Sequence, residues 1–539
     1  MHAAPVRAQV TGDLLLLARY GDRVYTSPRD QTRLYGRTDL GWSQDGFSAG
    51  GRVEFDRSSD NDPLGGRLTQ YEQVTQRWAE WRDARVHVRA GQFHTILGNG
   101  LLHRSYELPG VVYDEPGSGT RYAASRDVDG ALLELAAGPF AWRSFSGRFN
   151  DATISPASEA QGATRYGATL TGWQAEFRLP WNGRVGAAAL RSAPGGGPRR
   201  TFASGFAGLD ALSAWPHLGM SAPLTVEYAR EGGHISDWAR FSRDARVAHG
   251  LYASGALLWR AWSLTAEVKD LDGFRLGFND PPPLVREHTW SLLNRNTHLL
   301  DAESERGHQL ELNAPIRSWA ALTTSLATAD GQPPFQQPFR YEERFVELRV
   351  TPPGDDAWEV RTYADRGHDT HDFIGDRHAA GVSFAGRGPL GLAGEIELER
   401  QRVVRAGAIV TEPFEDLALT LGVSRSGWGS AGLTMVRTTD PLDRPSDLFG
   451  NPTAPSATFT GVTLAADVTQ RHHAELFVGR RRGGRACVSG TCYDVPSLDG
   501  AELRWTSRFP YPGAPPGPPP RSENYRTSSL VAVACESFT

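Results

Sequence analysis

The chain has 539 residues, 39% of them hydrophobic, and its 57 basic and 62 acidic residues leave a formal net charge of -5. A charge this close to neutral argues against nucleic acid as a partner, because binding to phosphates needs a clear excess of basic groups. The longest purely aliphatic run is Leu14–Leu17, whereas a transmembrane helix needs about 18 consecutive apolar residues. The composition therefore excludes a helical membrane protein.

The first residues carry a pattern typical of the end of an export signal. Val6-Arg7-Ala8 has the small-residue spacing that precedes a signal-peptidase cut, with Gln9 as the first mature residue. Met1 would then be internal and the true start would lie upstream; if synthesis begins at Met1, the case for export is weaker. We expect residues 1–9 to be the remnant of a signal region.

From residue 10 to residue 509 the chain shows a period of two rather than the 3.6-residue period of a long amphipathic helix. Such alternation predicts strands with one apolar and one polar face. The clearest examples are 85–90, 264–269, 309–313, 358–361, 392–399 and 501–509.

The spacing of the expected strands is more informative than the alternation. They come in pairs joined by tight turns, at 82–83, 181–183, 260–261, 352–356, 386–388 and 470–472. Successive pairs are separated by long polar segments, at 150–163, 191–222, 272–306, 366–376, 438–456 and 482–498. Short turns on one side and long loops on the other are typical of outer-membrane barrels. We predict an all-β fold, a single closed antiparallel transmembrane β-barrel of about 18–22 strands over residues 10–509.

The physical requirement for closure is that every backbone polar group in lipid must be paired within the protein. The outer face of each strand is then apolar, and tryptophans near strand ends form girdles at the membrane interfaces. The alternative is that they are ordinary core residues. The candidate girdle residues are Trp42, Trp78, Trp81, Trp181, Trp259, Trp262, Trp358 and Trp505.

The polar faces of three expected strands carry closely spaced charges that we predict to line the lumen. Fixed charges around a pore select which solutes pass. The alternative is that these side chains pair with their neighbours and fill the lumen without permeation. The predicted lumen-lining residues are Arg85, His87 and Arg89 on an early strand, Glu395, Glu397 and Glu399 on a late strand, and Glu502, Arg504 and Arg508 on the last.

The stretch FHTILGNGLLHRSYELPG, residues 93–110, follows one expected strand and precedes a long region without a clear strand. Its glycines permit tight turns that other residues resist. Gly98-Asn99-Gly100 lacks the third glycine and the helix that dinucleotide binding needs. We expect this stretch to fold inward as a plug or constriction, with His94, Gly98, Asn99, Gly100, His103, Arg104 and Glu107 at the narrowing.

Two stretches are similar to signatures of a bacterial outer-membrane β-barrel family of unassigned function. They are QFHTILGNGLLHRSYE, residues 92–107, and PPPLVREHTWSLLNR, residues 281–295. Asn99 stands where that family usually has arginine, so a role for that arginine does not transfer. The resemblance implies a porin-like barrel and supplies neither a substrate nor a reaction.

Cys487 and Cys492 enclose four polar residues, which suggests a disulfide in an oxidising compartment. A zinc site is the alternative, but no second cysteine pair exists to complete four ligands. Two other clusters could hold a metal ion, 366–378 through His and Asp and 56–66 through acidic residues; a solvated outer loop is the simpler interpretation of the first. We assign no metal and no cofactor.

No His-Glu-x-x-His or Walker-type phosphate loop occurs in the chain, so we expect no enzyme. Residues 510–539 are proline-rich and are predicted to be a disordered tail or an artefact of the reading frame. The predicted function is passage or binding of small polar solutes in a bacterial outer membrane. Its expected partners are outer-membrane lipids, the barrel-assembly machinery and those solutes, without nucleic acid. The alternative is an exported soluble β-rich protein that binds or hydrolyses carbohydrate.

Overall fold

The computed structural model describes residues 8–510 with internal gaps. The gaps are 26–28, 60–69, 116–118, 151, 181, 194–198, 213–216, 218, 233–247, 275, 277, 279–283, 285, 287, 299–303, 333–336, 353–357, 372–374, 406–411, 447–452 and 489–490. The predicted signal remnant up to residue 7 and the predicted tail from residue 511 lie outside the described residues. Pro510 itself belongs to the last strand.

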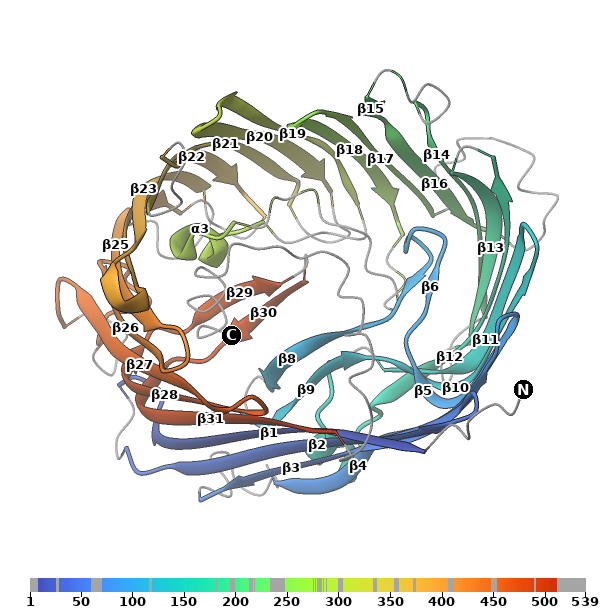
Figure 1. The fold of residues 1–539 in the computed structure, drawn as a ribbon, viewed down its shortest axis with the longest axis horizontal. Helices are drawn as coiled ribbons and strands as arrows, with labels where there is room; N and C mark the ends of the chain where they lie inside the picture. The colour runs from blue at the N-terminus through green and yellow to red at the C-terminus, as the bar shows by residue number, and fades with distance from the viewer. Residues whose placement is uncertain are drawn as a thin grey trace.

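The described chain forms one closed antiparallel barrel of 24 strands (Figure 1). Closure comes from pairing of the first strand with the last, with Leu16 opposite Trp505. The wall strands are β1 (Gln9–Asp22), β2 (Thr32–Gln44), β3 (Phe47–Ser58), β4 (Tyr71–Arg82), β5 (Val86–Phe93), β10 (Val128–Ala137), β11 (Phe140–Asn150), β12 (Tyr166–Leu179), β13 (Gly183–Ala193), β14 (Arg200–Asp210), β16 (Pro223–Glu231), β17 (His249–Trp259), β18 (Trp262–Asp272), β19 (Glu305–Arg317), β20 (Ala320–Gly331), β21 (Phe339–Val350), β22 (Trp358–Asp369), β23 (Gly375–Arg387), β24 (Leu392–Val404), β25 (Phe414–Arg425), β26 (Gly429–Thr438), β27 (Ala457–Thr469), β28 (His472–Arg481) and β31 (Leu498–Pro510). The short β15 (Met220–Ser221) pairs with β17.

The predicted fold class is confirmed, while the strand number exceeds the expected range. One missed strand is β14, which lies inside the stretch 191–222 that was expected to be a loop. Its sequence RTFASGFAGLD has small or apolar residues on both faces, so it shows no polar alternation. The expected loop 366–376 is also shorter, because β22 continues to Asp369 and β23 begins at Gly375.

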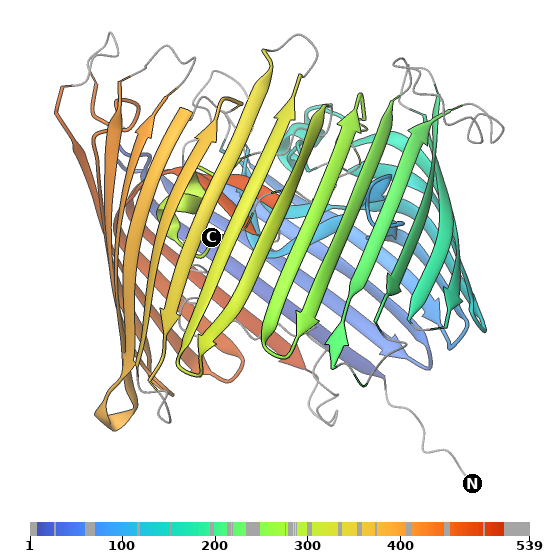
Figure 2. The same cartoon turned by 90° about the horizontal axis from the view of Figure 1, so that it is seen from above.

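The connections differ at the two ends of the barrel (Figure 2). At one end, called here the short-turn end, neighbouring strands are joined by turns such as 45–46, 138–139, 260–261, 318–319 and 470–471. The other, the long-loop end, carries the longer connections, and both β1 and β31 have their free ends at the short-turn end. In outer-membrane barrels short turns face the periplasm and long loops face outward.

The outward faces of the strands are apolar. Large hydrophobic side chains exposed by more than a third occur around the whole wall, among them Leu40, Val53, Val88, Leu135, Val185, Val226, Leu264, Leu310, Val346, Val382, Leu398, Val423, Val462 and Leu503. Exposed aromatic side chains lie beside the short turns: Trp42, Phe47, Phe140, Trp259, Trp262, Trp319, Trp358, Phe384 and Phe509. Trp78 differs from the expected girdle residues, because its ring lies under the guanidinium of Arg89 at 4.3 Å on the inner face.

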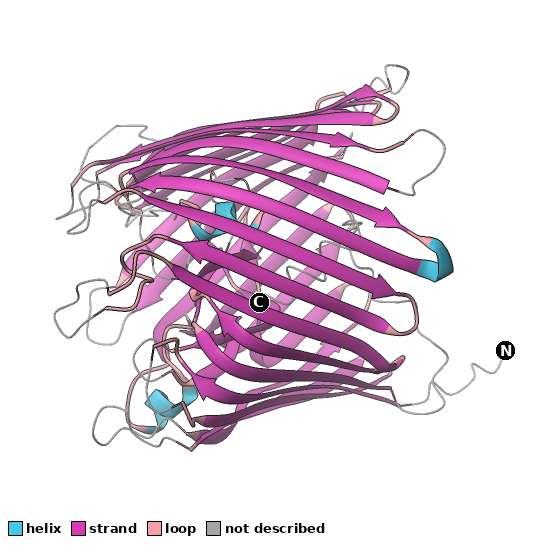
Figure 3. Ribbon diagram, turned by 90° about the vertical axis from the view of Figure 1, so that its left-hand side faces the viewer, coloured by secondary structure: helices cyan, strands magenta, loops and turns pink. Residues whose placement is uncertain are grey.

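Three segments of the described chain fold into the barrel (Figures 1 and 3). The first interior segment, residues 94–127, contains β6 (Ile96–Leu97), β7 (His103–Arg104), β8 (Tyr106–Asp114) and β9 (Arg121–Arg126). The second interior segment, residues 273–304, contains α3 (Ser291–Arg295), and the third interior segment, residues 482–497, contains the hairpin of β29 (Gly484–Val488) and β30 (Thr491–Val495). All three leave the wall at the long-loop end.

The other described helices are α1 (Pro156–Ala160) and the 3₁₀ turn η2 (Pro389–Gly391). Across the described residues, every helix is too short or too polar to cross a bilayer.

The largest buried apolar cluster lies inside the barrel. It joins inward residues of β5, β10–β14 and β16–β18 to the first and second interior segments, through Leu97, Leu101 and Leu102 on one side and Phe274, Leu276 and Phe278 on the other. The lumen of this barrel is therefore not polar all round, and one sector is filled with packed side chains.

Candidate functional site

The first interior segment enters the barrel through a turn that requires glycine. Gly98 and Gly100 have φ of +61° and +99°, a region that other residues adopt at a cost. A Cβ on Gly98 would lie 2.3 Å from Oε1 of Glu227 on β16. The backbone N–H of Asn99 donates to Glu227 at 2.6 Å, and that of Gly98 donates to Gln174 on β12 at 2.8 Å. Two wall strands thus hold the tip of this turn.

His103 lies in the apolar cluster rather than in an open lumen. Its ring centroid is 5.1 Å from that of Phe145 and 5.6 Å from that of Phe149, and its side chain is fully buried. Burial, with a smaller contribution from the charge of Arg126, lowers the pKa of His103 to about 3. His103 is therefore an enclosed part of the interior segment rather than of an open surface, and its place in a constriction stays a prediction.

The hairpin of β8 and β9 is fastened to the opposite wall by charged and polar groups. Glu107 of β8 accepts from Arg52 on β3 at 2.8 Å and from Arg37 on β2 at 3.4 Å. The backbone N–H of Ala123 on β9 donates to the buried carboxylate of Glu54 on β3 at 2.8 Å. Charge-assisted bonds of this kind are stronger than neutral ones and fix direction.

Arg121 of β9 is the centre of this attachment. Its guanidinium donates to Glu502 on β31 at 2.7 Å and to Asp114 on β8 at 3.2 Å, while its backbone N–H donates to Asp56 on β3 at 2.8 Å. Glu502 also accepts from Arg19 on β1 at 2.9 Å. The seam where the barrel closes, between β1 and β31, is therefore bridged from inside by the first interior segment.

The second interior segment is docked on β22 and β24 through the start of α3. The carboxylate of Glu399 accepts from the backbone N–H and hydroxyl of Ser291, at 3.0 and 2.7 Å, and from the backbone N–H of Leu292 at 3.2 Å. The hydroxyl of Tyr363 donates to the same carboxylate at 2.9 Å. The carboxylate thus satisfies N–H groups that a helix start leaves open.

A buried histidine joins the end of this segment to the wall. Nδ1 of His298 lies 2.8 Å from Asp369 of β22, and its other ring nitrogen lies 3.5 Å from Glu305 of β19. Burial disfavours the charged ring, but the hydrogen bonds to Asp369 and Glu305 outweigh it and raise the pKa of His298 to about 9. The ring stacks on Tyr341 with centroids 4.4 Å apart. At neutral pH this group is an imidazolium held between two carboxylates.

The third interior segment contacts the other two. Tyr493 of β30 packs with Leu108 and Val111 of β8, and Arg485 of β29 donates to the backbone carbonyl of Thr297 at 3.2 Å. The guanidinium of Arg482 is held by several wall and loop carboxylates, Asp416, Asp440 and Asp443. The three interior segments therefore form one contiguous body inside the barrel.

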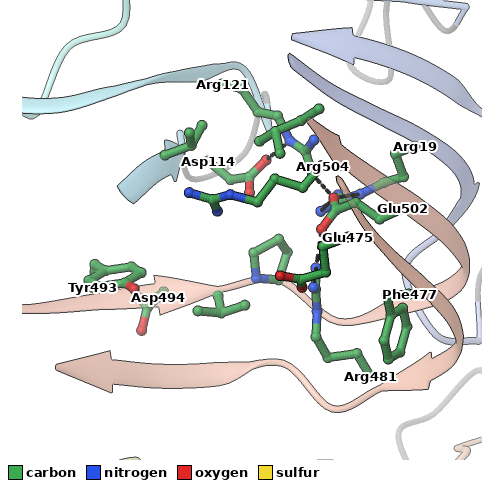
Figure 4. Close-up of a pocket in the computed structure, with 14 residues that line it drawn as sticks. Arg19, Asp114, Arg121, Glu475, Phe477, Arg481, Tyr493, Asp494, Glu502 and Arg504 are labelled. Carbon is green, nitrogen blue, oxygen red and sulfur yellow. Dashed lines mark hydrogen bonds and ion pairs between the residues drawn. The ribbon is translucent and has the colours of Figure 1, made fainter. Parts of the chain in front are cut away.

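A cavity lies between this body and the closing seam of the wall (Figure 4). It is partly open to solvent, and its lining combines apolar and charged side chains. The charged residues are Arg19, Asp114, Arg121, Glu475, Arg481, Asp494, Glu502 and Arg504. A second recess, at the short-turn end, is lined by residues of β4, β5 and β10–β12, including His87, Glu134, Arg143 and Glu176.

Comparison with known proteins shows a similarity of fold. A chain of the E. coli P pilus tip assembly intermediate PapC-PapD-PapK-PapG aligns with a TM-score of 0.50 at 10% identity, over 94% of this chain and 61% of that chain. The P pilus usher PapC translocation pore aligns with a TM-score of 0.44 at 9% identity, over 93% and 99%. The outer membrane protein OpdK of Pseudomonas aeruginosa aligns with a TM-score of 0.38 at 12% identity, over 72% and 98%. No protein-family model and no curated protein matches the sequence.

The decisive observation is the closed wall with an apolar outward face, flanked by exposed aromatics at the short-turn end. In water such a face would be unstable, and only a closed sheet satisfies its backbone within lipid. The protein is an outer-membrane β-barrel. The resemblance to porin-like barrels is confirmed at the level of the fold, and the alternative of a soluble β-rich protein is wrong.

The residues predicted to line the lumen of this β-barrel are in three different situations. Arg85 lies exposed in the short turn between β4 and β5, and Arg508 is 87% exposed near Asp13 at the same end. His87 and Arg89 point inward but are engaged, since both contact Glu80, at 3.1 and 3.2 Å. The strip they form is a paired network.

On the late strands, the inward position of the predicted residues follows from their neighbours. Ile396 and Leu398, between the three glutamates of β24, are 49% and 45% exposed on the outward face. Glu395 lies 3.6 Å from Arg361, while Glu399 is used to hold α3. Glu502 and Arg504 both contact the first interior segment, as Arg504 donates to the carbonyl of Gly110 at 2.7 Å.

The residues predicted at the constriction lie within the barrel but differ in their contacts and exposure. The ring of His94 lies 3.1 Å from Ser125 Oγ and remains partly open. Arg104 places its guanidinium over the ring of Tyr106 at 5.2 Å. Arg184 of β13 donates to the side-chain carbonyl of Asn99, and Gly98 and Gly100 shape the turn.

The two sequence clusters that could hold a metal ion are divided between different surroundings. His368 pairs with Asp376 at 3.0 Å on the outward face, whereas Asp369 points inward to His298, so β22 divides the sequence cluster between its two faces. In the part of the chain that the structure describes, no three His, Cys, Asp or Glu residues are placed to hold a metal ion. Asp56 bonds to Arg33, and most of the acidic stretch after it lies outside the described residues.

Cys487 and Cys492 lie directly opposite each other in the register of the β29–β30 hairpin. Their side chains lie outside the described atoms, so the disulfide stays a prediction.

Several residues that hold the interior body were missed in the sequence. Arg52, Glu54 and Asp56 alternate with Val53 and Phe55 on β3, a signal as clear as the charged strips predicted to line the lumen.

The stretch 46–50 matches the hydrolase motif Gly-x-Ser-x-Gly, yet Ser48 lies opposite Ser43 in the β2–β3 hairpin rather than on a strand-to-helix turn. That match is part of a short turn and gives no nucleophile.

Proposed function

We propose that this outer-membrane β-barrel is a passive pore for small polar solutes, narrowed by its three interior segments. The proposal rests on the way those segments are held. A barrel of 16–18 strands already leaves an aqueous channel and one of about 22 strands holds a plug, so 24 strands enclose a lumen wider than wall side chains can fill.

The distribution of contacts supports an incomplete plug. On the side of β10–β18 the interior body packs through the large apolar cluster, which excludes water. On the side of β1–β3 and β31 it is held by charged pairs, and the cavity at the seam is lined by eight charged side chains. The proposed passage for water and small polar solutes therefore lies on the second side. The proposal includes no catalytic step.

The charges of the cavity at the seam provide the test. Folded protein in a planar bilayer should give discrete conductance steps, and the double variant Glu475→Gln, Asp494→Asn should shift the reversal potential toward anion selectivity. These two carboxylates line the cavity at the seam. A matched control is the double variant Glu72→Gln, Glu415→Gln, which removes two carboxylates from exposed sites on the outward faces of β4 and β25.

The control should leave the selectivity unchanged. Folded protein that gives no conductance over many insertions would show that the interior body closes the lumen completely, and the role would then be structural. An equal shift by the control variant would show that the measured selectivity arises outside the lumen.

A further inference from the structure

A row of three arginines and one histidine crosses four neighbouring wall strands on the outside of the barrel. Arg344 of β21 lies directly opposite Arg366 of β22, which lies opposite His378 of β23, which lies opposite Arg402 of β24. All four side chains are exposed. We call these residues the cationic row; β21–β24 run side by side in Figure 2, coloured yellow to orange.

The row points away from the lumen. Phe345 and Ala379, each next to a residue of the row, and Tyr363, three positions before Arg366, pack inward against Trp290 and Leu293 of the second interior segment. Because successive side chains of a strand alternate between faces, the row lies on the opposite, outward face.

The row lies at the upper edge of the apolar band. Toward the short-turn end, the same outward faces carry Val346, Val382 and Leu398, which are 41%, 43% and 45% exposed. Toward the long-loop end, only two or three residues separate Arg402 and Arg366 from the ends of β24 and β22. This is the level at which the head groups of the outer leaflet meet a barrel.

The charges of the row form no close ion pair within the described residues. Within the described residues, no hydrogen bond or ion pair of the four side chains is found. The nearby carboxylates are used elsewhere: Glu415, opposite Arg402, bonds to Arg400 at 3.0 Å, and Asp376 pairs with His368 at 3.0 Å. Glu342 acts on Arg344 at longer range but bonds to Arg340.

Three exposed arginines elsewhere on the outward face near the long-loop end have partners. Arg57 pairs with Glu72 at 2.8 Å, Arg148 with Asp129 at 3.7 Å and Arg306 with Asp270 at 3.0 Å. Like charges directly opposite one another destabilise a sheet, and Arg344 and Arg366 are such a pair, so a counter-ion from outside the chain would stabilise the row. Guanidinium groups match phosphate oxygens in shape and charge.

We propose that the cationic row binds the phosphate groups of outer-leaflet lipids. The apolar side chains beneath it would contact the acyl chains of the same lipid while the arginines hold its head group. This surface lies outside the lumen, so the inference stands apart from the proposed pore.

The test compares binding of a diphosphorylated outer-leaflet glycolipid, in detergent micelles, to two triple variants of the full chain. One is Arg344→Gln, Arg366→Gln, Arg402→Gln; the matched control is Arg57→Gln, Arg148→Gln, Arg306→Gln. Each arginine near an anionic lipid surface contributes about a fivefold factor in affinity. The row variant should therefore bind about a hundredfold more weakly at low salt, and the control within about threefold of the unaltered protein.

Two further arms separate lipid from free anion and guard against misfolding. The unaltered protein should bind the same glycolipid without its phosphates as weakly as the row variant does, and inorganic phosphate at equal concentration should not displace the lipid. If heat-modifiable migration shows that the row variant does not fold, two other measurements test the proposal. They are binding of the dephosphorylated lipid to the unaltered protein and binding of the glycolipid to the single variant His378→Gln. Equal binding of both lipids, an equal loss in the control, or displacement by inorganic phosphate would each overturn the proposal.

Discussion

At the scale of single residues, the turn at Gly98 decides how the first interior segment enters the barrel. Its φ of +61° and the 2.3 Å that would separate its Cβ from Glu227 leave no room for a side chain. The carboxylate cannot withdraw freely, since it accepts from Asn99 at 2.6 Å. Backbone strain and steric conflict therefore coincide at one position.

We expect Gly98→Ala to destabilise the folded protein by about 2–4 kcal/mol, combining the left-handed strain with the displacement of Glu227. Gly162→Ala is the control, because Gly162 also has a positive φ, of +95°, but nothing lies within 4 Å of its Cβ. The control should cost about 1 kcal/mol. Urea unfolding in micelles measures the free energy of unfolding of both variants. Similar decreases in the two would show that the side chain of Glu227 moves aside without an energetic penalty.

The sequence pointed to this stretch correctly as chain that folds inward, but it could not assign roles within it. His94 and His103 are nine residues apart in one segment, yet one remains partly open and the other is enclosed by Phe145 and Phe149. Those two rings come from β11, more than forty positions away in the chain. A local pattern carries no information about such partners.

At the scale of elements, the interior segments are held by pairs that no single strand reveals. His298 is an example: its two carboxylate partners come from β19 and β22. The hydrogen bonds that raise its pKa to about 9 stabilise the folded state only while the ring is protonated.

The resulting pH dependence has a definite sign. The pKa of His298 in the folded state, about 9, lies above the usual 6.5, so its contribution is complete below about pH 6.5 and is lost as the pH rises through 9. Protection of residues 288–298 from hydrogen exchange, corrected for the intrinsic rate, should fall between about pH 6 and pH 10 by up to about 3 kcal/mol. Tyr341 and His371 also face this ring.

His298→Gln provides the comparison, since it cannot become charged and should give a nearly flat profile. The same fall in protection in the variant would assign the effect to other groups, Tyr341 or His371 among them.

Prediction of the wall elements succeeded where one face was apolar and the other charged, as on β24 and β31. It failed on β14, whose inward residues Phe202 and Phe206 belong to the internal apolar cluster. A strand between lipid and an apolar interior has no polar face, so the period of two disappears. The internal apolar cluster that removes the polar alternation from β14 is the same cluster against which the first and second interior segments pack.

At the scale of the whole molecule, the apolar outward face and the ion-paired interior reverse the arrangement of a soluble protein. Charged groups such as Arg121, Glu54 and Asp56 are buried inside, while leucines and valines are exposed outside. This inversion is stable only when the outward face lies in lipid.

Substitution at the centre of that face tests this arrangement. Leu398 is the middle residue of β24 and is 45% exposed on the outward face. Leu398→Arg should lower the stability of the barrel in lipid vesicles by about 2–4 kcal/mol, the cost of an arginine near the bilayer midplane. Leu390→Arg is the matched control: Leu390 is 79% exposed in the turn η2 at the short-turn end, where an arginine stays hydrated and should change stability by less than about 1 kcal/mol. Both are measured by urea unfolding followed through tryptophan fluorescence. If the two substitutions were equally neutral, the outward face of β24 would have to lie in water. The exposed apolar side chains along the wall would then have no lipid in contact with them, contrary to the assignment of the barrel to a membrane.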